Sequence, residues 1–294
     1  MDPGVDGLIV APPLGFRITD LRESLNSMGF ASLVERLQRE PAITLTVQRT
    51  RGSVPREAGT WMVVFAQGEW GTIGGGHLEF EAMAHARAML GGDADAPPVD
   101  KHFVLGPSLG QCCGGEVVVQ LARISAQDLP RLQQLHEKHR RPLALFGGGH
   151  VGKALVQVLA PLPFAVRWID SRDEIFPSDI APQVDCEHSN PVQAAVAHLR
   201  PNSAVLIMSF SHAEDLDVVM ACLQRQRQQG DLPYVGLIGS ATKWASFRSR
   251  LRARGFTEAE CDHVTCPIGV PGIEGKEPEV IAVAVAAQLL QLPN

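Results

Sequence analysis

Aromatic residues and excess positive charge are both scarce in this chain. Phe, Trp and Tyr together make up 5% of the 294 residues, and there is a single Tyr. Proteins that bind single-stranded nucleic acid stack the bases on aromatic rings, so this composition argues against that class. The chain has 26 Lys and Arg against 32 Asp and Glu, a net charge of −6. Such a chain is not attracted to nucleic-acid phosphates or to anionic lipid, so we expect neither a nucleic-acid nor a membrane partner.

Long apolar runs and a disulfide framework are missing from the sequence as well. No apolar stretch reaches the roughly 18–20 residues that span a bilayer. The first residues, MDPGVDGLIVAPPLGF, have no basic segment before their apolar patch and are interrupted by proline, unlike a secretory signal. The six cysteines show no framework-like spacing, which in a chain of this length is typical of free thiols in a reducing compartment. We therefore expect a cytoplasmic protein.

Length and pattern indicate two domains, each large enough to bury a core. We divide the chain into an irregular extension over residues 1–25, an N-terminal domain over 26–124, a helical connector over 125–141 and a C-terminal domain over 142–294. The connector ends at Arg140-Arg141-Pro142, where proline interrupts a helix.

In the N-terminal domain, alternating and apolar segments predict a mixed α+β arrangement. Strands are expected at residues 43–48, 61–65 and 116–121, and helices at 27–39 and 78–90.

The C-terminal domain predicts a different architecture. Residues 143–146 form an apolar run of the kind found in parallel strands buried on both faces. Strands and helices then alternate: strands are expected at 165–169, 204–208 and 234–238, and helices at 151–159, 216–228, 242–254 and 277–290. This alternation predicts a Rossmann-like, doubly wound parallel sheet, so the fold class is α/β with a mixed α+β domain in front.

The segment after the first of these strands carries a nucleotide-binding pattern. Gly147, Gly149 and Gly152 match G-x-G-x-x-G, and Asp170 lies 18 positions after the last of them. In dinucleotide-binding folds such glycines admit a phosphate to the helix N-terminus, and an acid about 20 residues on binds the ribose. The loop could hold a nucleotide or another phosphorylated ligand, or it could serve the fold alone.

Polar residues just past the predicted strands are further ligand candidates. Arg172 and Lys243 could neutralise phosphate, and Ser211 and Ser240 could donate hydrogen bonds. Each serine is equally well explained as a helix N-cap. His212 is more typical of a solvated loop histidine than of a catalyst.

A pair of adjacent cysteines between glycines is the most distinctive motif. Gln111, Cys112 and Cys113 stand in the run GQCCGG, where glycine leaves the backbone open and the thiols reachable. A turn that happens to hold two small residues is the plain alternative. Cys261, His263 and Cys266 lie close together elsewhere, but one such cluster without a second pair is not a zinc signature.

Two loops of the N-terminal domain could bind an anion. Arg51, Ser53 and Arg56 flank a Gly- and Pro-containing turn, and the glycines Gly74, Gly75 and Gly76 precede a predicted helix. Together these features could form a nest of backbone N–H groups. Two tight connections with solvated arginines would explain them equally well.

Taken together, these segments resemble the xanthine dehydrogenase accessory protein family, XdhC/CoxI. The matching stretches run in order over about residues 30–292: RGSVPR from Arg51, GTIGGGHLE from Gly71, LGQCCGG from Leu109, FGGGHVG from Phe146, GLIGSATK from Gly236 and CPIGVPGIEGKEPEVIA from Cys266. GQCCGG and the CPIG…GKEPE segment are specific, whereas the glycine fingerprint is generic. Residues 1–25 lie outside the resemblance.

The resemblance implies a cofactor chaperone with no catalytic residues of its own. It implies that the chain binds the molybdenum cofactor, holds it while a cysteine desulfurase supplies sulfur, and passes it to the large subunit of xanthine dehydrogenase. A homodimer would be typical.

Under this interpretation, the soft metal–sulfur centre suits Cys112 or Cys113 as a molybdenum contact. Gln111 and the backbone of Gly74, Gly75 and Gly76 would bind the pterin or its phosphate, with Arg51 and Arg56 as further phosphate ligands. Related members can have cysteine at the position of His77, so a role for that residue is not carried over.

Two other functions fit the sequence. An NAD(P)-dependent oxidoreductase would use the Gly147 loop and Asp170, with His212 or Lys243 as the nearby acid or base, but it would leave the cysteine motif unexplained. A regulatory nucleotide sensor would use the C-terminal domain to control the other domain.

Overall fold

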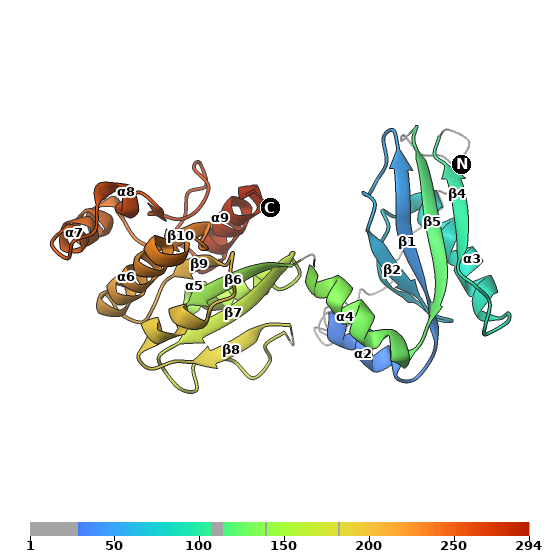
Figure 1. Ribbon diagram of the computed structural model, residues 1–294, viewed down its shortest axis with the longest axis horizontal. Helices are drawn as coiled ribbons and strands as arrows, with labels where there is room; N and C mark the ends of the chain where they lie inside the picture. The colour runs from blue at the N-terminus through green and yellow to red at the C-terminus, as the bar shows by residue number, and fades with distance from the viewer. Residues whose placement is uncertain (1–28, 107–113, 139, 182, 294) are drawn as a thin grey trace, which may run out of the picture.

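The computed structural model describes residues 29–106, 114–138, 140–181 and 183–293. Within these ranges the chain forms two separate β-sheets, one in each half of the sequence (Figure 1). None of the helices in the described ranges combines the length and the apolar character needed to cross a membrane.

The first sheet is antiparallel and has the strand order β3-β2-β1-β5-β4. Its strands are β1 (Ala42–Arg51), β2 (Trp61–Val64), β3 (Glu69–Gly71), β4 (Val99–Val104) and β5 (Glu116–Ile124). A register shift between Val47 and Arg49 interrupts the ladder of β1 with β5. Such a bulge changes which face the following residues present.

Helices cover both faces of this sheet. Ile43, Leu45 and Val47 of β1 form one core with the inner side of helix α3 (Gly76–Leu90). Ala42 and residues of the neighbouring strands face the other way and pack on helices α2 (Phe30–Leu37) and α4 (Leu129–Lys138). The short 3-10 turn η2 (Ala126–Asp128) leads into α4 and is closed by a capping box between Ser125 and Asp128.

The second sheet is parallel throughout and has the order β11-β10-β9-β6-β7-β8. Its strands are β6 (Arg141–Phe146), β7 (Phe164–Asp170), β8 (Asp185–His188), β9 (Ala204–Ile207), β10 (Tyr234–Leu237) and β11 (Val264–Thr265). Numbered from β6, this is the order 3-2-1-4-5-6 of a dinucleotide-binding Rossmann sheet, with its topological switch point between β6 and β9. The structure thus confirms the predicted fold class.

Two layers of helices bury this sheet. Helices α5 (His150–Leu159) and α9 (Pro278–Gln291) pack on one face around Trp168. The other face carries η3 (Val192–His198), α6 (His212–Gln229), α7 (Ala241–Arg252) and α8 (Glu258–Cys261). The strand ends at the switch point are therefore held from both sides, which fixes the loops that follow them.

Candidate functional site

Three segments singled out in the N-terminal half meet at one end of the first sheet. Gly115 lies so close to the Arg51–Val54 turn that a Cβ there would stand 2.4 Å from the Ser53 carbonyl oxygen and 2.5 Å from that of Arg51. Its own carbonyl accepts the N–H of Leu105 at 2.8 Å. The residues on either side of positions 107–113 are thereby held next to the turn.

The glycine loop completes this convergence. A Cβ on Gly74, whose φ is +123°, would stand 2.6 Å from Cβ of Pro55 and 3.3 Å from Cγ of Arg56. Only glycine combines that backbone conformation with so close an approach. The turn from Arg51 to Arg56 thus lies between the glycine loop and the start of β5. We call these three segments the loop cluster.

Gln111, Cys112 and Cys113 lie outside the described residues, so their prediction as cofactor and metal ligands is untested. The structure does place Gly114, which directly follows Cys113, at the loop cluster: its carbonyl oxygen lies 3.8 Å from the position of a Cβ on Gly52.

The glycine loop is not an empty anion nest. Glu79 Oε2 accepts the N–H of Ile73 at 2.9 Å and that of Gly75 at 3.1 Å, together with the hydroxyl of Thr72. The N–H of Gly74 donates to the same hydroxyl oxygen at 3.0 Å. In this structure the Thr72 hydroxyl accepts the amide of Gly74 and the Glu79 carboxylate accepts that of Gly75, and the binding of a cofactor by the backbone of Gly74, Gly75 and Gly76 stays a prediction. Glu79 stood inside the quoted motif, but nothing in the sequence marked its role.

The arginines of the turn remain available to a ligand. Arg51 and Arg56 are both exposed. Arg51 also borders a hollow of about 470 Å³ over strands β1, β4 and β5, lined by Arg49, Thr50, Asp100, His102, Glu116 and Val118. His77 lies at the start of α3 and contacts Glu81, with 3.0 Å between Nε2 and Oε1.

The glycine fingerprint of the second domain follows strand β6 and leads into helix α5, as predicted, and it lies at the switch point between β6 and β9. A Cβ on Gly147 would stand 2.0 Å from the Met208 carbonyl oxygen, and one on Gly152 would stand 2.1 Å from that of Gly147. A Cβ on Gly149 would instead have nothing within 4 Å. Gly149 is the N-cap residue of α5, which has no side-chain cap. Two glycines therefore serve packing, whereas the middle one faces open space in front of the helix N-terminus.

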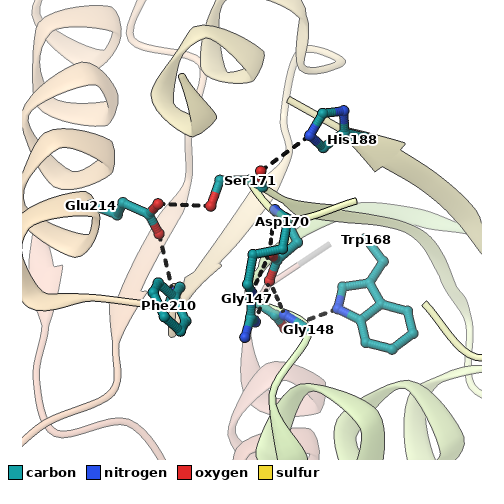
Figure 2. A network of polar contacts seen from close by, with 9 residues as sticks. Gly147, Gly148, Trp168, Asp170, Ser171, His188, Phe210 and Glu214 are labelled. Carbon is teal, nitrogen blue, oxygen red and sulfur yellow. Dashed lines mark hydrogen bonds and ion pairs between the residues drawn. The ribbon is translucent and has the colours of Figure 1, made fainter. Parts of the chain in front are cut away.

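Asp170 is buried beside this loop and its carboxylate is fully engaged (Figure 2). Gly148 N–H and the Arg172 side chain donate to it. Burial raises the pKa of this carboxyl, but the hydrogen bonds outweigh burial and hold the pKa below its usual value. In this structure Asp170 therefore stabilises its own loop, and its role as a ribose-binding acid stays a prediction.

The remaining polar candidates are also occupied within the domain. Ser211 accepts the N–H of Glu214, and Ser240 accepts that of Lys243, so both serines are N-caps. Lys243 Nζ lies 2.6 Å from Asp215 Oδ2 and 2.8 Å from the Ile238 carbonyl oxygen, a paired and mostly buried cation. Neither Arg172 nor Lys243 is a free phosphate ligand here. His212 is the first residue of α6, with its ring edge-on to Phe247.

The ranges that the structure describes contain no cluster of three or more potential metal ligands. Cys261 is buried, and the ring of His263 contacts the Leu232 carbonyl at 2.8 Å. Burial raises the pKa of the Cys266 thiol, with opposing effects of Lys243 and Asp215.

A further cavity of about 340 Å³ lies between α2, α4 and the starting ends of β6 and β7. Phe30, His136, Arg140 and Ser203 are among its lining residues. The glycine fingerprint lies beyond the carboxyl ends of the strands, which is where such sheets bind their ligands. This cavity lies at the opposite end of the sheet. It contains none of the predicted site residues.

Fold and site define a two-domain α/β protein, in which an antiparallel domain with a cluster of motif loops precedes a Rossmann domain. Residues 36–96 match the model of the XdhC and CoxI family, and residues 143–289 match that of the XdhC Rossmann domain. The chain belongs to the XdhC and CoxI family.

Two relatives extend this comparison. The uncharacterized protein YqeB of Escherichia coli K12 is 29% identical over 254 residues, which cover 83% of this chain and 42% of YqeB. The chain thus spans about two fifths of the length of that relative. A crystal structure described as a xanthine dehydrogenase from Bacillus halodurans superposes with a TM-score of 0.70 at 19% identity, covering 90% of this chain and 96% of that one. At this identity the match establishes the fold.

Proposed function

We propose that this chain acts in the maturation of xanthine dehydrogenase, as a chaperone that binds the molybdenum cofactor. It holds the cofactor during sulfuration and delivers it to the large subunit of the enzyme. Membership of the XdhC and CoxI family supports the maturation role. The observation that carries the finer proposal is the loop cluster, where the Arg51–Arg56 turn, the glycine loop and the start of β5 meet.

The chemistry of the loop cluster suits this cargo. Thiolates prefer soft metals, so Cys112 or Cys113 would contact the molybdenum centre, with Gln111 beside them on the pterin. Arg51 and Arg56 are exposed, and a guanidinium matches the geometry of a phosphate. Because Gly74 and Gly75 already bond to Thr72 and Glu79, the arginines rather than these amides would bind the cofactor's phosphate.

The remaining parts of the proposal concern partners and place. A cysteine desulfurase would supply the sulfur, the chain would work in the cytoplasm as a homodimer, and it would be an assembly factor rather than an enzyme. The loop at Gly147 would give the second domain a site for a phosphorylated ligand, since Gly149 is open at the start of α5.

Cofactor retention tests the proposal. The chain would be purified without oxygen, and its molybdenum and pterin content would be measured for the wild type, Cys112→Ala and Cys113→Ala. Near-stoichiometric cofactor in the wild type and its loss in at least one of the two variants is the expected result. Cys186→Ala is the matched control, because Cys186 is an exposed thiol on β8 of the other domain. Wild-type protein that neither retains nor takes up cofactor would refute the proposal.

A further inference from the structure

A Rossmann domain that binds NAD uses the acid at the end of its second strand to hold the ribose hydroxyls. Here that acid is Asp170, the last residue of β7. Its side chain is 1% exposed, and each of its oxygens accepts two N–H groups. Oδ1 accepts the backbone N–H and Nε–H of Arg172, each at 2.9 Å. Oδ2 accepts Gly148 N–H at 2.5 Å and Arg172 Nη2 at 2.9 Å.

A carboxylate offers about four lone-pair positions, so these four bonds leave none for a ribose hydroxyl. Two of the four come from the side chain of one residue, Arg172, in the paired arrangement that makes Arg–carboxylate contacts strong. Arg172 therefore takes up the acceptor positions on Asp170 that a ribose would need.

Contacts from the neighbouring loop hold Arg172 in place. Its guanidinium carbon lies 4.6 Å from the ring centroid of Phe210, which follows β9 on the other side of the switch point. Phe210 N–H donates to Glu214 Oε2 at 3.2 Å, and Ser171 Oγ donates to Glu214 Oε1 at 2.7 Å (Figure 2). The loops after β7 and β9 are thus joined across the place where an adenosine would lie.

The shape and the charge of the region beside Asp170 also disfavour a bound dinucleotide. The side chain of Ile175 lies 2.6 Å from the position of a Cβ on Gly148, so it packs directly on the fingerprint loop. Asp170, Arg172 and Glu214 together carry one net negative charge. A 2′-phosphate, as in NADP, would therefore meet repulsion here rather than a free arginine.

We propose that Arg172 is the residue that determines ligand specificity in the second domain: by occupying Asp170, it excludes NAD-type dinucleotides from the fingerprint loop. Ligands that reach Gly149 must then carry a phosphate without placing a ribose beside β7. This inference rests on the part of the proposed function that gives the Gly147 loop a phosphorylated ligand. It also argues against an NAD(P)-dependent oxidoreductase.

Calorimetric titration of the full chain with NAD⁺ tests this inference. The wild type is expected to show no binding at millimolar NAD⁺. Arg172→Ala frees the Asp170 carboxylate and is expected to bind at least tenfold more tightly than the wild type. Adding Asp170→Asn to that variant should abolish the gain, because the ribose would lose its acceptor.

Arg227→Ala is the matched control, since Arg227 forms an ion pair with Glu260 on another surface of the same domain. It is expected to behave like the wild type. Circular dichroism and thermal unfolding would verify that each variant is folded, and Arg172→Gln, which is closer in size, would replace the alanine variant if that one unfolds.

Micromolar binding of NAD⁺ by the wild type would overturn the inference. So would variants of Arg172 that bind NAD⁺ no better than the wild type. Molybdenum content measured on the same preparations separates this result from the chaperone proposal, because NAD⁺ binding by the second domain does not depend on cofactor in the loop cluster.

Discussion

Glycines, which have no side chain, allow the loops of the N-terminal domain to approach one another closely. Gly115 and Gly74 stand where a Cβ would meet the backbone of the Arg51–Val54 turn or the ring of Pro55. A Cβ on Gly114, one position earlier than Gly115, would have no other atom within 4 Å. At the scale of single residues, the loop cluster therefore depends on particular glycines, not on glycine content in general.

Replacing Gly115 by alanine should open the loop cluster. The added methyl would collide with two backbone carbonyls, so we expect a loss of about 1–3 kcal/mol in the free energy of unfolding, together with reduced cofactor retention. Urea unfolding measures the first effect. Gly114→Ala is the control, because it changes the unfolded chain in the same way but meets open space. Equal unfolding free energies for the two variants would show that Gly115 is not packed as described.

The sequence predicts the positions of site residues better than their partners. The spacing of Gly147, Gly149 and Gly152 before Asp170 predicted the loop between β6 and α5 and the acid at the end of β7, because this spacing follows from the geometry of the turn and the strands. Arg172 donates hydrogen bonds to Asp170, and Glu79 accepts the amides of the glycine loop. Both contacts depend on side-chain rotamers and on neighbouring charges. The sequence pattern specifies neither of these.

Helix α4 joins the two sheets, and its interior contact with α2 is aromatic. The ring of His136 stacks on Phe30 with 4.5 Å between centroids and 12° between planes, and Arg140 Nη1 lies 3.1 Å from its Nε2. Burial, with a further contribution from the charge of Arg140, lowers the pKa of His136 from 6.5 to about 4. This helix pair therefore contains a histidine that is neutral at physiological pH.

Acid should weaken the α2–α4 contact. The unfolded chain binds a proton at His136 near pH 6.5 and the folded chain only near pH 4, so stability is lost as pH falls through this window. Allowing for partial exposure, we expect about 1–2 kcal/mol from this residue between pH 7 and 4.5. His136→Phe keeps the stacking and removes the titration, so urea unfolding at both pH values should show a smaller loss. An unchanged loss would contradict this role of His136.

Elements with strong apolar patterns could be predicted, and edge strands could not. Strands β1 and β6 and helices α3 and α9 fall where the sequence indicates, because each buries a continuous apolar face. Strands β3, β4, β8 and β11 were missed; β8 reads DCEH and is mostly exposed, and β11 has two residues. The first turn of α6 was also missed, since its residues HAED are polar and the Ser211 cap defines its start.

For the whole molecule, the candidate site residues fall into two groups, one in each domain. The antiparallel domain contains exposed arginines and the residue that follows the cysteine motif, whereas in the Rossmann domain Gly149 is open and the Asp170 carboxylate is already hydrogen-bonded within the chain. The fold class and the family resemblance were predictable because the motifs span both domains. The groups that already bond to the glycine loop and to Asp170 could not be predicted, because they depend on which polar groups the fold leaves unpaired.

Delivery of cofactor to the client enzyme tests the central claim most directly. Cofactor-free large subunit of xanthine dehydrogenase would be incubated anaerobically with the loaded chain and a cysteine desulfurase, and xanthine oxidation would then be measured. We predict activation by the wild-type chain and none by whichever of Cys112→Ala and Cys113→Ala fails to retain cofactor. A large subunit that gains no activity from fully loaded wild-type chain, although free cofactor activates it, would contradict the account.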